Sequence, residues 1–259
     1  MKNKKMKTNL EDLTFLFAVK PDSIIRIENL LAITNYIFRY FKTNLSVLEV
    51  STYNNSIIHK VIDRKIDYRF VEDKDPIFHR TKYRNLMTKE VETPFLAVWD
   101  VDVIVDKQLI IDTMEKLRNG EADVAFPYDG KLYDTSDIIR SLFIRKNQIK
   151  ILHKNKDCMS LIYGNDHAGG AFIVNTKKYK QTGMENEKFY GWGWEDYERY
   201  DRWINLGLNI YRASGCMYHL SHPRDMNGNF TSQRQKEISK AEHIKTWKSS
   251  GEELILWNK

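Results

Sequence analysis

The sequence predicts an α/β fold in which helices are layered on a sheet. Short apolar runs alternate with segments of helical periodicity through the first half of the chain. The run FLAVW at residues 95–99 is apolar on both faces, which is typical of a central parallel strand. The length of 259 residues, with 42% hydrophobic and 29% charged residues, suits one large soluble domain or two small ones.

The elements of the first half follow in a regular order. The run LTFLFAV predicts a buried strand at 13–19, and Asp22 or Ser23 can cap the helix predicted at 24–41, where apolar residues recur at helical spacing. Further strands are predicted at 45–51, 68–73 and 95–99, and a further helix at 78–89. This order predicts a sheet with helices packed on it.

The second half is less regular. Helices are predicted at 107–119 and at 194–207, where Gly207 supplies a stop signal, and a helix or extended lobe is predicted at 138–156. The remaining segments are a strand with a turn at 123–130, a strand at 169–175, strand-like pieces at 209–215 and 216–220, a polar loop at 222–233 and a C-terminal helix. The sequence contains no repeat and no low-complexity linker, so a single domain is the simplest interpretation.

Charge and cysteine content narrow the class of protein. The net charge is +6, and cations gather at the N-terminus and at residues 145–156, without the interleaved aromatics of a nucleic-acid groove. Either a solvated surface or contact with an anionic membrane or lipid phosphate accounts for them. Two cysteines, Cys158 and Cys216, indicate no disulfide framework and favour a cytoplasmic setting. We expect neither a signal peptide nor a membrane span, since the apolar runs are too short.

The sharpest local signal is WDVDV at residues 99–103. Asp100 and Asp102 follow a buried strand directly, and two residues at i and i+2 lie on the same side of an extended chain. Open α/β sheets bind ligands at the carboxyl ends of such strands. Two carboxylates there suit Mg²⁺ or Mn²⁺ bridging to a diphosphate, although a solvated strand end is the alternative.

Two histidines follow a strand-like run in YHLSHPRD. His219 and His222 lie three residues apart, and Pro223 argues against a helix. An imidazole can join a carboxylate on Mn²⁺, whereas an ordinary hydrogen-bonded role for each histidine is the alternative.

The stretch FYGWGWEDY at residues 189–197 sets two indoles beside two glycines and ends on an acid pair. A core helix disfavours two glycines, because each costs about 1 kcal/mol relative to alanine. The segment is better interpreted as a wall around a ligand. Glu195 and Asp196 either stabilise a helix start through its dipole, or one of them acts as a general base.

Five motifs, in order, resemble those of the GT-A glycosyltransferases. The chain is similar to the catalytic domain of the β-1,4-galactosyltransferases and to related bacterial family 2 enzymes over about residues 13–230. The matching stretches are FHRTKYRN (78–85), WDVDV (99–103), AGGAFIV (168–174), FYGWGWED (189–196) and HPRD (222–225).

The resemblance implies a GT-A fold, a single Rossmann-like domain with a mixed, mostly parallel sheet. Its expected parts are a basic tail at 1–12, a nucleotide-sugar-binding half at about 13–105, an acceptor-side half at about 106–230 and a C-terminal helix at about 231–259.

The resemblance also implies a donor and metal site. Asp102 and His222 would hold Mn²⁺ or Mg²⁺, and His219, which stands where the family has a methionine ligand, would either be a third ligand or point into the core. Asp100 would contact the ribose or sugar of the donor, and Arg80 its phosphates or sugar. The further donor-site candidates are Lys20, Asp22, Arg26, Gly170 and Trp192.

On the acceptor side, the resemblance implies that Glu195 binds sugar hydroxyls and that Asp196 deprotonates the acceptor hydroxyl. Trp192 would lie beside the bound sugars, on a loop whose glycines let it move. Trp194 replaces a glycine of the family motif and Tyr197 replaces an acid, so acceptor choice should differ from that of the galactosyltransferases.

The expected function is therefore an inverting, metal-dependent transfer of a hexose, galactose or N-acetylgalactosamine, from a UDP-sugar to a glycan or lipid-linked acceptor. A non-catalytic nucleotide-sugar or glycan-binding protein on the same fold is the alternative. No nucleic acid is expected as a partner. The family's membrane anchor is not seen, which suggests a bacterial cytoplasmic enzyme of surface polysaccharide synthesis, with its basic N-terminus against the inner face of the membrane.

Overall fold

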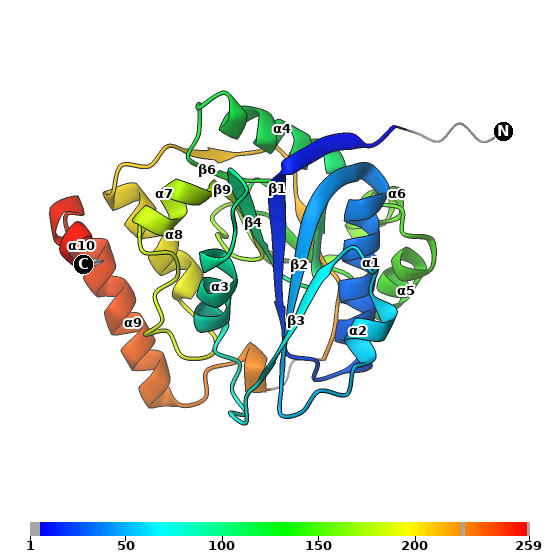
Figure 1. Cartoon of the computed structure of the whole chain (residues 1–259), viewed down its shortest axis with the longest axis horizontal. Helices are drawn as coiled ribbons and strands as arrows, with labels where there is room; N and C mark the ends of the chain where they lie inside the picture. Colours follow the sequence, from blue (N-terminus) through cyan, green and yellow to red (C-terminus); the bar gives the residue numbers. More distant parts are fainter. Residues whose placement is uncertain (1–5, 224–225, 258–259) are drawn as a thin grey trace.

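The computed structural model describes residues 6–223 and 226–257, so Arg224 and Asp225 of the HPRD motif lie outside the described residues. A seven-stranded sheet runs through the molecule in the order β10-β6-β9-β4-β1-β2-β3 (Figure 1). The strands are β1 (Thr8–Val19), β2 (Phe41–Ser51), β3 (Asp67–Glu72), β4 (Phe95–Trp99), β6 (Val124–Phe126), β9 (Ala171–Asn175) and β10 (Ile210–Arg212). Only β9 runs antiparallel to its neighbours, β4 and β6, so the mixed, mostly parallel sheet is confirmed.

A second, four-stranded sheet lies beside the first and was not predicted. Its order is β5-β11-β7-β8, with bounds β5 (Val103–Val105), β11 (Met217–His219), β7 (Leu132–Asp134) and β8 (Ser160–Tyr163). Three of these strands have only three residues, which is too few for the alternating pattern of a strand to be recognised in the sequence. In this sheet β11 pairs with both β5 and β7. His219 therefore lies opposite Val103, directly after Asp102.

Helices cover the main sheet on both sides. Figure 1 shows α1, α5 and α6 to the right of the strands, and α3, α7 and α8 to their left. The helices are α1 (Ile24–Tyr40), α2 (Ile57–Val61), α3 (Arg80–Lys89), α4 (Lys107–Arg118), α5 (Asp137–Lys146), α6 (Lys150–Lys154), α7 (Thr176–Gln181), α8 (Glu195–Asn205), α9 (Gln233–Lys248) and α10 (Gly251–Trp257). Of the two predicted caps for α1, it is Ser23 whose side chain accepts a hydrogen bond, from the Arg26 amide.

Several predicted bounds were wrong. Strand β1 begins at Thr8, so the residues just before 13 belong to the sheet and not to a tail. Helix α1 ends at Tyr40, and Phe41 opens β2 with an extended backbone (φ −123°, ψ 146°). The short helices α2 and α7 were missed, because five or six residues carry little periodicity. The 138–156 segment contains two helices, and the C-terminal segment also contains two, separated at Ser249, which is extended.

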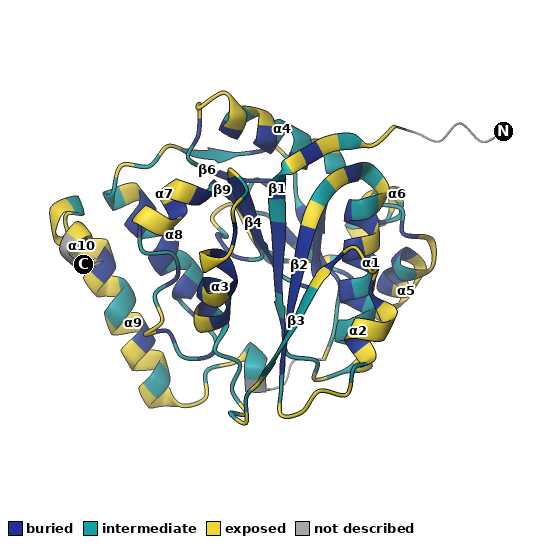
Figure 2. Cartoon of the chain, viewed as in Figure 1, coloured by how far each residue is buried: buried dark blue, intermediate teal, exposed yellow. Residues whose placement is uncertain are grey.

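The core positions the site through β4. All five residues of β4 are buried, and Trp99 packs edge-on against Phe15 of β1 with ring centroids 5.3 Å apart. Figure 2 shows this buried interior between the two helical layers. Two backbone hydrogen bonds then fix the segment that leaves β4, from the Asp100 amide to Gly170 (2.8 Å) and from the Leu220 amide to Asp102 (2.7 Å). Among the described residues, no helix combines the length and apolar character that a bilayer crossing requires.

Candidate active site

A cavity of about 300 Å³ opens where β1 and β4 end, and β11 borders it. This is the edge at which open α/β sheets bind ligands. All fourteen predicted site residues line it: Lys20, Asp22, Arg26, Arg80, Asp100, Asp102, Gly170, Trp192, Trp194, Glu195, Asp196, Tyr197, His219 and His222. The structure therefore brings the predicted residues together, while their chemical roles stay predictions.

Three potential metal ligands converge on one side of the cavity. One ligand atom each from Asp102, His219 and His222 lie within 4.8 Å of one another. The Nε2 atoms of His222 and His219 lie 3.0 and 3.9 Å from Asp102 Oδ2. His219 does not point into the core, since it lines the cavity and its Nε2 faces Asp102, while its role as a third metal ligand stays a prediction.

Hydrogen bonds behind the two histidines select the nitrogen that each presents. Nδ1 of His219 lies 2.7 Å from Asp134 Oδ1, and Nδ1 of His222 lies 2.8 Å from the Pro223 carbonyl oxygen. Asp134 can only accept, so Nδ1 of a neutral His219 ring carries the proton and its Nε2 is left as the ligand atom. For His222 the carbonyl at 2.8 Å is nearer to Nδ1 than Arg26 Nη2 at 3.4 Å, which favours the same tautomer. Asp134 was not identified from the sequence, since it is 85 residues away from His219 and belongs to the unpredicted sheet.

Arg26 balances the charge of this cluster. Its Nη1 donates to Asp102 Oδ2 (3.2 Å) and its Nε donates to Asp22 (2.9 Å). Burial alone would raise the pKa of Asp102, but His222, His219 and Arg26 outweigh it and hold that pKa well below its usual range. Asp102 is therefore a carboxylate at neutral pH, as a ligand must be.

Lys20 lines the cavity, but its ammonium group is hydrogen-bonded to the protein. Its Nζ donates to the carbonyl oxygens of Asp75 (2.5 Å) and Pro76 (2.8 Å) in the loop after β3. Lys20 thus ties this loop to the end of β1, at the rim of the predicted donor site.

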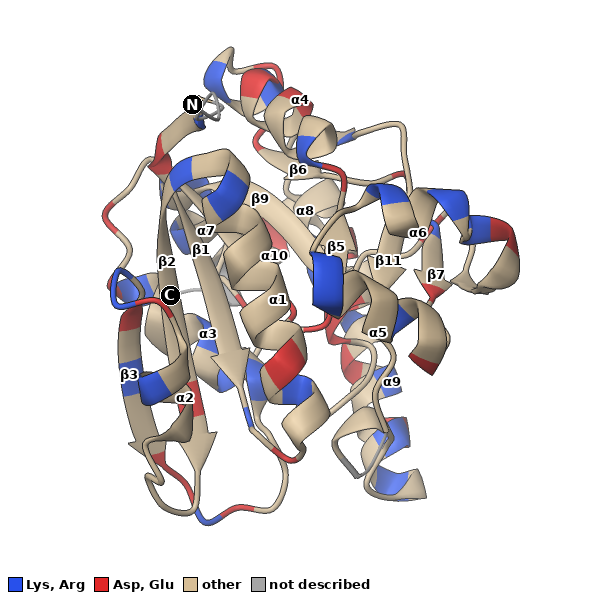
Figure 3. Cartoon of the chain, turned by 90° about the vertical axis from the view of Figure 1, so that its right-hand side faces the viewer, with Lys and Arg blue, Asp and Glu red and all other residues tan. Residues whose placement is uncertain are grey.

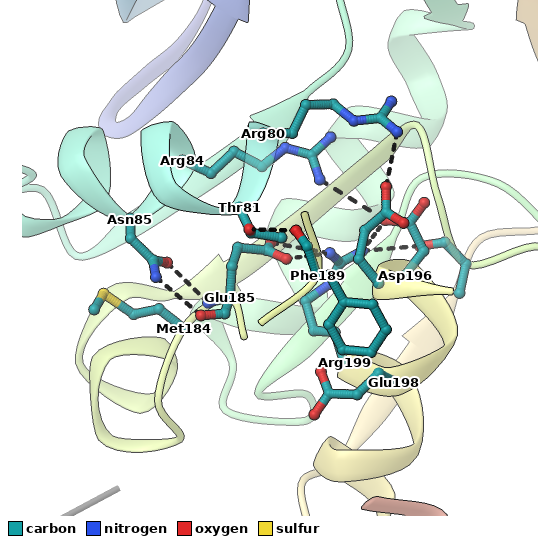
Figure 4. A network of polar contacts seen from close by, with 12 residues as sticks. Arg80, Thr81, Arg84, Asn85, Met184, Glu185, Phe189, Asp196, Glu198 and Arg199 are labelled. Carbon is teal, nitrogen blue, oxygen red and sulfur yellow. Dashed lines mark hydrogen bonds and ion pairs between the residues drawn. The ribbon is translucent and has the colours of Figure 1, made fainter. Parts of the chain in front are cut away.

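Helix α3 faces the acid pair across the cavity. Figure 4 shows Arg80 and Arg84 reaching from α3 toward the start of α8. Arg80 Nη2 donates to Glu195 Oε1 (2.9 Å), and Arg84 Nη2 donates to Asp100 Oδ1 (2.6 Å). Arg84 was missed, although it lies within the FHRTKYRN stretch. Its charge offsets Asp100, and its Nη1 also lies 3.8 Å from Asp196.

A buried ion-pair network fixes Asp196. Arg199 Nη2 donates to Asp196 Oδ1 (2.8 Å), and Arg199 Nη1 contacts both carboxylate oxygens of Glu185 (2.9 and 2.8 Å). Burial would raise the pKa of Asp196, but Arg199 and Arg84 hold it well below its usual range. Asp196 is therefore ionised at neutral pH, as a general base must be. Arg199 and Glu185 were not predicted, although the i, i+3 spacing of Asp196 and Arg199 on a helix is a readable signal.

The backbone before α8 is strained into position. Trp194 adopts a left-handed conformation (φ 70°), which favours glycine and is uncommon for a residue with a bulky side chain. Gly193 (φ 110°) lies against Phe230, and the Gly193 amide donates to Glu195 Oε2 (2.7 Å). The Glu195 side chain thus stabilises this turn as well as facing the cavity.

Aromatic side chains form a further part of the cavity wall. Trp192 packs edge-on against Phe230 (5.4 Å between centroids), and Trp194 stacks on His243 of α9 (5.4 Å). Tyr163 and His167, which were not predicted, stack in parallel at 4.1 Å and also line the cavity. Burial lowers the pKa of His167 to about 4, so its ring is neutral at physiological pH.

Gly169 leaves the space that Asp196 occupies. A Cβ on Gly169 would overlap Asp196 Oδ2 and would lie 3.0 Å from Asp196 Cγ. We expect Gly169→Ala to displace the carboxylate and to lower kcat by about a hundredfold, because misplacement by about 1 Å can cost that much. Steady-state kinetics of sugar transfer, with nucleotide affinity measured in parallel, tests this.

The matched control is Gly164→Ala in the same loop, where an added Cβ meets nothing within 4 Å. We expect it to keep the wild-type rate. Equal losses in both variants, or loss of nucleotide affinity in Gly169→Ala, would contradict a local effect on Asp196.

Comparison with known proteins finds distant sequence similarity to galactosyltransferases. Residues 152–224 match the family model described as the N-terminal domain of galactosyltransferase. The β-1,4-galactosyltransferase 7 of Homo sapiens is 25% identical over 123 residues, which are 48% of this chain and 28% of that protein. The Mus musculus protein matches to the same extent. Over these residues the chain shows distant homology to β-1,4-galactosyltransferase 7.

Solved structures extend the similarity of the fold. The catalytic domain of Drosophila β-1,4-galactosyltransferase 7 in complex with xylobiose has a TM-score of 0.52 at 16% identity, covering 90% of this chain and 79% of that one. A mutant of the Drosophila enzyme in complex with manganese, UDP-Gal and xylobiose has a TM-score of 0.54 at 15% identity, covering 88% and 79%. The GT-A fold of the galactosyltransferase catalytic domains is thereby confirmed for this homologue.

Proposed function

We propose that this galactosyltransferase homologue is an inverting, metal-dependent glycosyltransferase. It would move a hexose, galactose or N-acetylgalactosamine, from a UDP-sugar to a hydroxyl of a glycan or lipid-linked saccharide. The observation that carries the proposal is that the Asp102–His219–His222 cluster and the ionised Asp196 open onto one cavity. The manganese, UDP-Gal and xylobiose in the Drosophila structure support it.

The cluster fits Mn²⁺ better than Mg²⁺. It offers one carboxylate and two imidazoles, whereas Mg²⁺ prefers oxygen ligands alone. Asp102, His219 and His222 would hold the ion, and Asp134 would keep the ring of His219 turned toward it. The bound ion would supply Lewis-acid stabilisation to the departing nucleoside diphosphate.

The remaining donor residues act by position and charge. Arg26 and Arg80 line the cavity beside the cluster and beside Glu195, where a diphosphate would meet both guanidinium groups. Asp100, held by Arg84, would accept a hydrogen bond from a ribose or sugar hydroxyl. Gly170 lines the cavity with a positive φ (81°), and a Cβ there would overlap the Met217 side chain, so only glycine lets the backbone lie at this point of the wall, where it would face the donor.

Asp196 would accept the proton of the acceptor hydroxyl. As the acceptor oxygen bonds to the anomeric carbon, the bond from that carbon to the diphosphate oxygen breaks on the opposite side, which inverts the anomeric configuration. Arg199 keeps Asp196 ionised and turned to the cavity. Trp192, Trp194 and Tyr197 offer aromatic faces for the apolar face of a sugar ring, while Glu195 would bind its hydroxyls.

The cellular context belongs to the same proposal. We place the enzyme in the cytoplasm, at the inner face of a bacterial membrane, in the synthesis of a surface polysaccharide. The chain spans only 28% of the length of its curated relatives. The cellular context is therefore inferred from the low cysteine content and the basic segments of the sequence.

Nucleotide-dependent stabilisation tests the donor site. We expect UDP with Mn²⁺ to raise the melting temperature, because a ligand present at about 100 times its Kd stabilises the native state by about 2.7 kcal/mol. Asp102→Ala should abolish this shift by removing the carboxylate ligand, and UDP alone should give little shift.

The control is Asp157→Ala, an exposed acid in the 3₁₀ turn before β8. It should keep the full shift. If no uracil nucleotide stabilises the wild-type protein with or without Mn²⁺, the transferase proposal fails. If UDP-sugar binds but is never turned over with any acceptor, a non-catalytic sugar-binding protein is the better description.

A further inference from the structure

Helices α5 and α6 carry a basic surface that the proposed reaction does not use. Residues 138–156 include six Lys or Arg and no Asp or Glu. Arg140 is buried and paired with Glu28 at 2.7 Å. Within residues 6–223 and 226–257, none of the other five cations has an acidic partner in an ion pair, and Lys156 instead lies over the ring of Tyr133 at 4.6 Å.

The same surface exposes aliphatic side chains. Ile138 of α5 is 74% exposed and Leu142 is 38% exposed. Positions i, i+4 and i+7 share one face of a helix, so Arg145 continues the stripe that Ile138 and Leu142 begin. Figure 3 looks onto this side of the molecule, where α5 and α6 lie next to each other and show Lys and Arg in blue. We call this the α5–α6 face, consisting of Ile138, Leu142, Arg145, Lys146, Lys150 and Lys154.

The α5–α6 face begins at the rim of the candidate active site. Helix α5 follows β7, whose last residue, Asp134, contacts His219. Asp137, the first residue of α5, accepts a hydrogen bond from Ser221 (3.3 Å), the neighbour of His222. The end of this face at Ile138 therefore lies beside the cavity.

We propose that the α5–α6 face docks the protein on an anionic phospholipid surface. Lysine and arginine side chains gain energy within a Debye length of such a surface, and exposed aliphatic side chains gain by entering its interface. A nucleic acid would neutralise the cations, but it would leave Ile138 and Leu142 exposed to water. An anionic lipid surface would both neutralise the cations and bury these aliphatic side chains, so we favour it. The proposal does not depend on transferase activity. If both hold, the cavity meets its lipid-linked acceptor at the membrane.

Vesicle sedimentation of the full chain tests this. We expect binding to phosphatidylcholine vesicles that contain phosphatidylglycerol, and none to phosphatidylcholine alone. Lys150→Gln/Lys154→Gln should weaken binding by roughly 25-fold, since each cation near such a surface contributes roughly fivefold. Ile138→Ser/Leu142→Ser should weaken binding while keeping its salt dependence, because only the apolar contribution is removed.

Matched control variants lie on α8 and α9. Lys240→Gln/Lys248→Gln removes the same charge from exposed positions of α9, and Ile204→Ser/Ile238→Ser removes exposed aliphatics from α8 and α9. Both should bind vesicles as the wild type does. Equal loss in these controls, no binding to anionic vesicles, or oligonucleotide binding that only the lysine variant weakens would each overturn the proposal. The UDP shift on the same variants separates this outcome from failure of the proposed function.

Discussion

Asp196→Asn is expected to lower kcat for sugar transfer by about 10²–10⁴, the usual contribution of a general base. The substitution preserves the shape of the side chain while removing the carboxylate that would accept the proton. Affinity for UDP and Mn²⁺ should change little, because Asp196 contributes no ligand atom to the Asp102–His219–His222 cluster. Measuring UDP release in the presence of acceptor, and UDP binding by titration, separates the two effects.

The matched control is Asp166→Asn, an exposed acid in the loop before β9. It should keep the rate within about twofold, as surface substitutions usually do. A wild-type rate in Asp196→Asn would show that the base lies elsewhere. Loss of UDP binding together with turnover would show that Asp196 supports the fold of the site rather than the proton transfer.

The low pKa of Asp196 also sets an expected pH profile. The group stays ionised as the pH falls toward the ordinary carboxyl range, so protonation of Asp196 should not limit the rate of transfer above about pH 5. If the rate of transfer falls with decreasing pH already above about pH 5, a group other than Asp196 is being protonated.

The sequence predicted the site best where a motif directly follows a helix or strand with a clear hydrophobic pattern. The five buried residues of β4 lead directly into Asp100 and Asp102, so a local apolar run both predicted the strand and placed the acids at its end. The glycines before α8 likewise marked a shaped turn, and the left-handed Trp194 shows why. Local pattern is enough when the residues concerned are neighbours in the chain.

Partners far apart in the sequence could not be predicted. Asp134 reaches His219 only because β7 pairs in register with β11, and both strands have three residues. Arg84 meets Asp100 from a different helix, and Glu185 meets Arg199 from the loop before α8. The charges of these residues were visible, but their pairing depends on tertiary packing, about which spacing in a single sequence carries no information.

Arg199→Met is expected to lower the unfolding free energy substantially, because Arg199 belongs to one of these distant ion pairs. Arg199 and Glu185 have side chains about 1% exposed and are joined at 2.8 Å, and the guanidinium also lies 4.4 Å from the centre of the Phe172 ring. Methionine fills a similar volume, but among the described residues it leaves the buried Glu185 carboxylate with the Tyr179 hydroxyl as its side-chain hydrogen-bond donor and with only the longer-range charge of Arg84. Removing one partner of a buried ion pair costs about 3–5 kcal/mol, so urea unfolding should show a loss of that size.

A double variant distinguishes the ion pair from simple loss of packing. Glu185→Gln/Arg199→Met removes both charges, so it should be more stable than Arg199→Met alone. Arg234→Met, at an exposed position of α9, should change stability by no more than about 0.5 kcal/mol. If the double variant is no more stable than the single one, then packing rather than charge accounts for the loss.

The loss of unfolding free energy in Arg199→Met should depend on pH. This dependence measures the share of the loss that comes from the interaction of Arg199 with Asp196. In the wild-type protein the folded pKa of Asp196 is depressed, so its ionisation stabilises the fold above the unfolded pKa and that stability is lost as the pH falls through the folded value. Without Arg199 the folded pKa rises. The difference in unfolding free energy between the wild type and Arg199→Met should therefore narrow as the pH falls below about 4. A difference that stays constant from pH 7 to pH 3 would mean that Arg199 stabilises the fold without stabilising the proposed catalytic carboxylate.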